Sequence, residues 1–161
     1  MTEVTSSAVS VILPVLNEER YLEHAVSAIL EQDFKGSIEV ILAIAPSKDR
    51  TLQVAQALAR SDSRVKIVDN PSGRTAAGLN IAIKHSKYPI IVRVDGHANI
   101  PNNYISIAVQ LLNETGAVNV GGVMAAEGQN AFENAVARAM RSPLGVGGAK
   151  FHTGGEAGEV D

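Results

Sequence analysis

Two residues with metal-binding side chains stand two positions apart at the end of a predicted strand. Asp95 follows the apolar run Ile90–Val94, and His97 comes directly after Gly96. A carboxylate oxygen and an imidazole nitrogen suit Mn²⁺ somewhat better than Mg²⁺. A divalent ion held there would neutralise the charge of a departing diphosphate. Taken alone, an aspartate at the end of a strand more often caps a turn, with the histidine beside it on the surface.

A second segment, residues 73–80 (Gly-Arg-Thr-Ala-Ala-Gly-Leu-Asn), opens a predicted helix with small residues and one cation. Small side chains let a ligand approach the backbone, and the N-terminus of a helix attracts an anion. Arg74 would add a charge-assisted contact to phosphate. We expect Asn80 to lie on the inner face of this helix. An ordinary helix start, packed closely through Ala and Gly, is the alternative reading of the segment.

The elements that position these residues follow from the spacing of apolar side chains. Short apolar runs predict strands at residues 8–13, 38–44, 65–68, 90–94 and 117–123, the first one stopping at Pro14. Helical spacing predicts helices after Asn17 and Asp49, which would cap them, and at about 75–85, 101–116 and 130–141. Strands alternating with helices imply an α/β fold, with a mostly parallel Rossmann-like sheet covered by helices on both faces. Ligands of such sheets bind at the carboxyl ends of the strands.

Length and composition bound the class of protein. The 161 residues suffice for one domain with a sizeable core. A formal net charge of −3 gives no electrostatic case for nucleic-acid binding. No cysteine is present, which excludes disulfides and thiolate sites. No apolar run approaches the roughly 20 residues of a membrane-spanning helix.

The motifs taken in order resemble the inverting glycosyltransferase family 2, which has a GT-A fold. The opening stretch Val9–Glu19 looks like the strand and turn that line the nucleotide base in that family. The Ala-Gly-Leu-Asn stretch within Gly73–Ile83 is similar to the helix that approaches the donor diphosphate, and Val94–His97 stands where the family has its Asp-x-Asp metal motif. The subgroup resembling succinoglycan-type exopolysaccharide glucosyltransferases fits best, because it pairs an Asp-x-His form with Gly121-Gly122 and the loop Ser142–Gly148.

The resemblance implies a set of site residues and a division of the chain. The metal ligands would be Asp95 and His97, for Mn²⁺ or Mg²⁺. The nucleotide-binding residues would be Pro14, Val15, Asn17, Glu18, Ser47, Arg74, Asn80 and Asp95. Residues 1–141 would form the nucleotide-sugar-binding subdomain, and the glycine-rich residues 142–161 would lead to an acceptor subdomain that this sequence does not include. No residue matches the catalytic base, which we expect beyond Asp161.

One departure from the family pattern bears on the donor. Ile44-Ala45 replace an Asp-Asp pair whose first member contributes to base recognition, and only Ser47 and Asp49 remain of the turn that follows. The resemblance therefore leaves the donor nucleotide open.

The implied activity is metal-dependent transfer of a sugar, with inversion, from a nucleoside-diphosphate sugar to a glycan or lipid-linked acceptor. Cell-surface or exopolysaccharide synthesis would be the setting, in the cytoplasm or at the inner face of the membrane in the full-length protein. A non-catalytic nucleotide-binding or scaffold module on the same fold is one alternative, and a sugar nucleotidyltransferase is another. The latter would need a glycine-rich, basic loop after the first strand, which Pro14–Asn17 does not supply.

Overall fold

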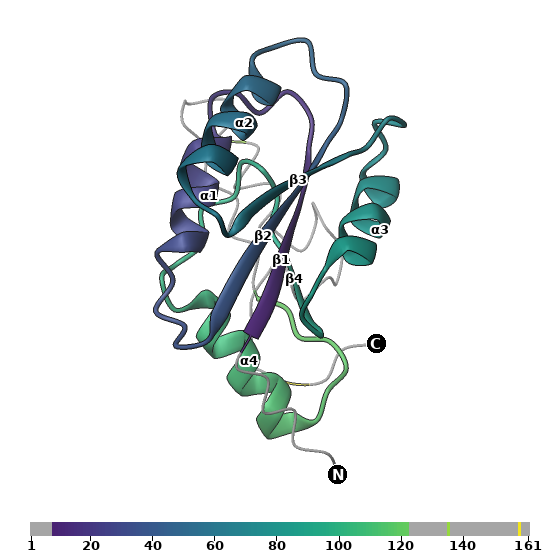
Figure 1. Cartoon of the computed structure of the whole chain (residues 1–161). Coiled ribbons are helices and arrows are strands. Elements are labelled where there is room, and N and C mark those ends of the chain that lie inside the picture. Colours follow the sequence, from purple (N-terminus) through teal and green to yellow (C-terminus); the bar gives the residue numbers. More distant parts are fainter. Residues whose placement is uncertain (1–7, 123–134, 136–157, 159–161) are drawn as a thin grey trace. The chain divides into compact units, whose positions relative to one another are not determined.

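The computed structural model describes residues 8–122, together with Ala135 and Gly158 (Figure 1). The chain divides into two compact units, Met1–Ala117 and Val118–Asp161. Strands and helices alternate along the first unit in the order β1 (Ala8–Val15), α1 (Leu22–Leu30), β2 (Ser37–Ile44), α2 (Thr51–Ser61), β3 (Val65–Asp69), α3 (Thr75–His85), β4 (Ile90–Arg93) and α4 (Tyr104–Thr115). None of the described helices is long and apolar enough to cross a membrane.

The four strands form one sheet in the order β3-β2-β1-β4, and every neighbouring pair is parallel. The two inner strands are the longest and pair along their whole length, from Ala8 opposite Ser37 to Val15 opposite Ile44. They are apolar almost without interruption, as expected for strands that are covered on both faces. The predicted parallel α/β sheet is therefore confirmed.

Helices cover the sheet on both faces (Figure 1). The larger core cluster joins one face to helices α1, α2 and α4 through buried residues such as Leu22, Val26, Ala55 and Ile105. The smaller cluster joins the other face to α3, where Ala82 packs with Ile12, Ile41 and Ala43.

Helix α3 approaches the sheet closely at Gly78. A Cβ atom added there would lie 2.7 Å from Nδ2 of Asn70, which is itself 2% exposed and donates a hydrogen bond to the Arg74 carbonyl. Close packing through glycine, the alternative reading of this segment, therefore applies at Gly78.

The amino ends of the strands carry a buried polar network centred on Glu39. Its carboxylate accepts hydrogen bonds from the Ser10 hydroxyl at 2.6 Å, the Lys66 ammonium at 2.7 Å and the Lys87 backbone N–H at 2.6 Å. The Ser10 hydroxyl in turn accepts the Tyr88 N–H. Burial raises the pKa of Glu39, but the hydrogen bonds from Lys66, Ser10 and Lys87 together outweigh it and lower the pKa below its ordinary value. The network ties the connection between α3 and β4 to the sheet.

Two predicted boundaries around the first loop differ from the structure. Strand β1 does not stop at Pro14 but runs to Val15. The Ile12 carbonyl points toward β4 and accepts the Val94 N–H. Alternate residues of a strand direct their backbone groups to the same side, so the backbone nitrogen of Pro14 also faces the β4 side. Strand β4 has ended by then, and the missing N–H of proline therefore removes no ladder bond. Asn17 does not cap a helix, because α1 begins only at Leu22 and a turn closed by the Glu18 carbonyl intervenes.

The predicted strand at residues 117–123 does not form over its described part. Residues 117–122 are in no strand, and Val118 is fully exposed. Two glycines in this short run weaken its strand preference, and a strand needs a paired neighbour to be stable. The predicted helix at about 130–141, Ala135 apart, and the predicted division at residue 141 fall outside the described residues and stay predictions.

Candidate functional site

The carboxyl ends of all four parallel strands lie at one edge of the sheet. Strands β1, β2, β3 and β4 end at Val15, Ile44, Asp69 and Arg93. The loops that follow contain every site residue predicted from the sequence except Asn80, which lies on α3, and Pro14 and Val15, which close β1. Such an edge is where open α/β sheets bind their ligands.

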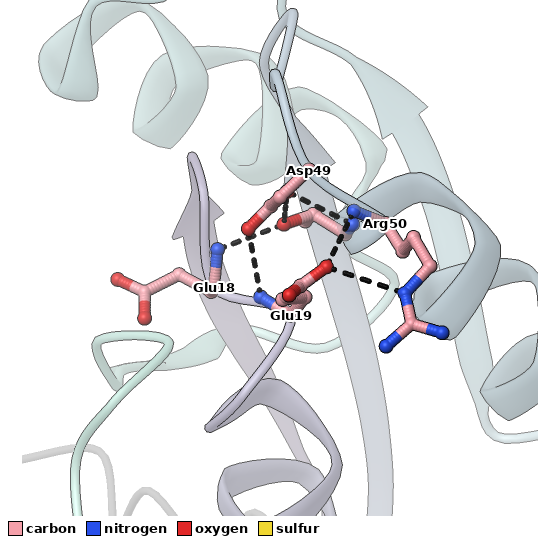
Figure 2. Close-up of polar contacts among 5 residues, drawn as sticks. Glu18, Glu19, Asp49 and Arg50 are labelled. Carbon is pink, nitrogen blue, oxygen red and sulfur yellow. Dashed lines mark hydrogen bonds and ion pairs between the residues drawn. The ribbon is translucent and has the colours of Figure 1, made fainter.

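The β1–α1 and β2–α2 loops are joined by reciprocal hydrogen bonds (Figure 2). The backbone N–H of Glu18 donates to the Thr51 hydroxyl at 2.8 Å, and that of Glu19 donates to the Asp49 carboxylate at 3.2 Å. In return, the Glu19 carboxylate accepts the Arg50 backbone N–H at 2.8 Å. The Thr51 hydroxyl also donates to Asp49, which is the main reason that the pKa of Asp49 is lowered. The two loops and the first residue of α2 therefore form one hydrogen-bonded unit, called the loop platform below.

Asp49 was predicted to cap α2, and the structure places its carboxylate on the Thr51 N–H at 3.0 Å, next to the N-cap position at Arg50. The prediction did not include its bond to the first loop. No sequence signal indicates that bond, because Asp49 and Glu19 stand 30 positions apart. Thr51, 0% exposed, was not singled out at all.

Asn17 and Ser47 use their polar groups inside this platform. The Ser47 hydroxyl accepts the Asn17 N–H at 3.1 Å and donates to the Ala45 carbonyl at 3.1 Å. The Asn17 side-chain oxygen accepts the Lys48 N–H at 2.8 Å. Asn17 has a positive φ of 57°, a conformation that asparagine adopts more readily than most residues. Both residues therefore shape the loops through groups that are already engaged.

Pro14 and Val15 close strand β1 at the same edge. The Val15 side chain is 1% exposed and packs in the larger core cluster, so only its backbone faces the loops. Its carbonyl accepts the Ala45 N–H at 2.9 Å. Pro14 is half-buried.

Asp95 lies just beyond β4, half-buried, and its Oδ1 atom accepts hydrogen bonds from the Arg93 guanidinium at 3.1 Å. Both of these contacts are made by Oδ1, and neither involves the second carboxylate oxygen, Oδ2. Among the described residues, no group of three or more His, Asp or Glu side chains could hold a metal ion by itself. Divalent ions in phosphate-transferring sites are commonly held by one or two side chains together with substrate phosphates. The carboxylate oxygen of Asp95 and the imidazole nitrogen of His97 are ligand atoms that fit that kind of site.

His97 is exposed, and its Nδ1 atom lies 2.7 Å from Oε1 of Glu18. Gly96 makes this approach possible, because an added Cβ would lie 3.0 Å from the Glu18 Cγ. The structure therefore places the predicted site residues Glu18 and His97 together, although 79 positions separate them in the sequence. Sequence reasoning listed both residues and did not predict their contact.

Arg74 and Asn80 lie at and beyond the start of α3. Arg74 occupies the N-cap position, and its side chain is exposed to solvent, where it is free to meet an anion. Asn80 was predicted on the inner face of the helix, and this is wrong: the inner positions are Gly78 and Ala82, while Asn80 is exposed. The helical period places residue 80 about 200° from residue 78 around the axis, on the outer side.

Comparison with known proteins agrees with this arrangement. The family model described as "Glycosyl transferase family 2" matches residues 10–156. The succinoglycan biosynthesis protein ExoA of Rhizobium meliloti is 33% identical over 156 residues, which cover 94% of this chain and 47% of that protein. The chain thus spans about half the length of this relative.

Solved structures share the fold. A mannosyltransferase from Pyrobaculum calidifontis superposes with a TM-score of 0.60 at 27% identity, covering 83% of this chain and 40% of that one. TarS of S. aureus superposes with a TM-score of 0.60 at 24% identity, covering 76% of this chain and 24% of that one, which bears on the fold alone. A parallel sheet whose polar loops gather at one edge, matched in sequence by the family model over most of its length, places this chain in glycosyltransferase family 2 with a GT-A fold.

Proposed function

We propose that this chain binds the donor in an inverting, metal-dependent glycosyltransferase that acts in cell-surface or exopolysaccharide synthesis. The donor would be a nucleoside-diphosphate sugar, and the acceptor a glycan or a lipid-linked glycan. The observation that carries the proposal is the position of Asp95 and His97 beside the loop platform at the carboxyl edge of the sheet. The relative from R. meliloti is named for succinoglycan biosynthesis, and the P. calidifontis enzyme is a mannosyltransferase solved with GDP-Man and Mn²⁺.

Each part of the site has a chemical task in this proposal. Asp95 and His97 would hold a divalent ion, which when bound supplies positive charge to the departing nucleoside diphosphate. Arg74, exposed at the N-terminus of α3, would contact a phosphate oxygen. The loop platform would shape the edge that faces the nucleoside, through the positions of Pro14, Asn17 and Ser47.

The base that activates the acceptor hydroxyl is not assigned to any described residue. We further propose that the full-length protein works in the cytoplasm, at the inner face of the membrane, where a lipid-linked acceptor would be reached. Ile44-Ala45 stand where the family pattern has two acids, the first of which contributes to base recognition, so the proposal names no single nucleotide.

Calorimetry with Mn²⁺ and a panel of UDP, GDP and ADP tests the proposal. We expect one nucleotide to bind only when Mn²⁺ is present. Asp95→Asn should weaken that binding at least tenfold, because the amide loses the charge that attracts the ion. Glu23→Gln, on the exposed side of α1, is the matched control and should bind as the wild type does. Failure of every nucleotide to bind the wild-type chain would contradict the proposal.

Sugar transfer by the full-length gene product separates the enzyme from a non-catalytic module. We expect transfer from a radiolabelled nucleotide sugar to an endogenous membrane or glycan fraction, and its loss in Asp95→Asn. Nucleotide binding without any transfer would favour the scaffold alternative.

A further inference from the structure

We infer that Glu18 is a positioning residue: by accepting a hydrogen bond from Nδ1, it would hold the His97 imidazole in the form whose Nε2 atom can ligate the divalent ion. The inference rests on the proposed function, because it assigns His97 to the divalent ion. It changes the role of Glu18, which the sequence placed among residues that contact the nucleotide.

The contact between Glu18 and His97 determines which ring nitrogen carries hydrogen. Oε1 of Glu18 lies 2.7 Å from Nδ1 of His97. An ionised carboxylate only accepts hydrogen bonds, so Nδ1 must be the donor. In a neutral ring, Nε2 then has no hydrogen and presents a lone pair, which is the form that ligates a metal ion. Histidine ligands of metals regularly donate their other N–H to a carboxylate in this way.

Glu18 is held more firmly than His97, so we expect Glu18 to set the orientation of the His97 ring and not the reverse. The Glu18 side chain is 15% exposed, whereas that of His97 is 63% exposed. The Glu18 backbone is fixed by the Thr51 hydroxyl, and its side chain packs against Gly96, which is buried. Figure 2 shows the Glu18 carboxylate pointing away from the platform that holds its backbone. The platform thus carries the carboxylate that orients the ring.

If the contact were only a structural ion pair, its removal would change the free energy of unfolding little. An exposed pair of this kind contributes little to folding, because solvent screens it and both side chains lose freedom. Orientation of a ligand has a larger effect, because loss of such an outer partner typically weakens metal affinity by about 10- to 100-fold. The magnitude of the effect on metal binding therefore distinguishes the two roles.

The test compares Glu18→Ala, Glu18→Gln, His97→Ala and the double variant Glu18→Ala/His97→Ala in the full chain. Mn²⁺ affinity is measured by electron paramagnetic resonance and calorimetry, with whichever of UDP, GDP and ADP binds the wild type present as the probe nucleotide. We expect Glu18→Ala to weaken Mn²⁺ binding about 10- to 100-fold. Glu18→Gln should recover part of this loss, since its side-chain oxygen still accepts from Nδ1. In the His97→Ala background, Glu18→Ala should add no further loss.

A second readout needs no metal. Nitrogen NMR of ¹⁵N-histidine-labelled chain, with the His97 signal assigned from His97→Ala, reports which ring nitrogen carries hydrogen. We expect the Nδ1–H form in the wild type and a shift toward the Nε2–H form in Glu18→Ala. Glu23→Gln, on the exposed side of α1 and outside the platform, is the control and should leave the His97 signal unchanged.

The outcomes separate this inference from the proposed function. Equal Mn²⁺ affinity of the wild type and Glu18→Ala, with nucleotide binding intact, would overturn the inference alone. So would an Nε2–H ring in the wild type, or additive losses in the double variant. Failure of the wild type to bind Mn²⁺ with any of UDP, GDP and ADP would overturn the proposed function and the inference with it.

Discussion

The absence of a side chain at Gly96 is what lets Glu18 lie between two loops. Gly96→Ala places a Cβ 3.0 Å from the Glu18 Cγ, closer than such atoms normally approach. Because the Glu18 backbone is anchored to Thr51, the side chain must give way. We expect a loss of about 1–3 kcal/mol in the free energy of unfolding, measured in urea.

Gly121→Ala is the control for this change, because an added Cβ there meets no atom of the described residues within 4 Å. Its stability should stay within about 0.5 kcal/mol of the wild type. A Gly96→Ala variant as stable as Gly121→Ala would show that Glu18 is free to move.

The buried Glu39 predicts how stability depends on pH. Its pKa in the folded chain is lowered from the ordinary value of 4.5. A lowered folded-state pKa stabilises the fold fully above the unfolded value and loses this contribution as the pH falls through the folded value. Glu39→Gln should therefore cost about 1.5–3 kcal/mol near neutral pH. The difference from the wild type should shrink below pH 4.5. Urea midpoints measured from pH 7 to pH 3 check this, with the exposed Glu23→Gln as control.

Single residues were predicted best where their role is local. The spacing of Asp95 and His97 after an apolar run indicated their place at the sheet edge, and the structure has both there. The partner of His97 was not predictable, because the Glu18 contact spans 79 positions and depends on two loops folding together. Asn80 was misplaced because α3 presents Gly78 and Ala82 to the sheet. Residue 80, midway between them in the sequence, therefore lies on the outer face of the helix.

At the scale of elements, the platform depends on the Thr51 hydroxyl at the start of α2. Thr51→Val keeps the shape of the side chain and removes the acceptor of the Glu18 N–H as well as a donor to Asp49. Leaving such groups unpaired costs about 1–3 kcal/mol, which urea unfolding should detect. Amide exchange at Glu18 should also become faster.

Thr51→Ser, which keeps the hydroxyl, should behave much more like the wild type. Equal stability of the valine and wild-type chains would mean that water replaces the hydroxyl and that the two loops are held by other contacts.

The order and type of the elements from β1 to α4 followed from the sequence, since short unbroken apolar runs alternate with longer stretches of helical spacing. The helix predicted at 75–85 matches α3. Boundaries failed where long-range bonds replaced local ones: Asn17 has the residue type of a helix cap, yet its side chain bonds to Lys48 on the next loop. Residues 117–122 have strand-like valines, but strand pairing is a tertiary property that a short apolar run cannot report.

For the whole molecule, the first unit should fold without the second. Among the described residues, every member of both core clusters lies between Val9 and Leu112. A fragment of residues 8–117 should therefore unfold in one cooperative urea transition and give a dispersed amide NMR spectrum. A spectrum typical of a collapsed, unpacked chain would show that residues beyond Ala117 complete the core.

The pairing of Ser10 with Glu39 has a consequence for folding fidelity. Strands β1 and β2 are buried along nearly their whole length, so a slipped alignment would still bury apolar side chains on both faces. It would, however, move Glu39 away from the Ser10 hydroxyl and leave a carboxylate with fewer partners in an apolar interior. The polar pair therefore penalises misaligned sheets that the hydrophobic pattern alone would tolerate. It lies near the amino ends of the strands, away from the carboxyl edge that carries the candidate site.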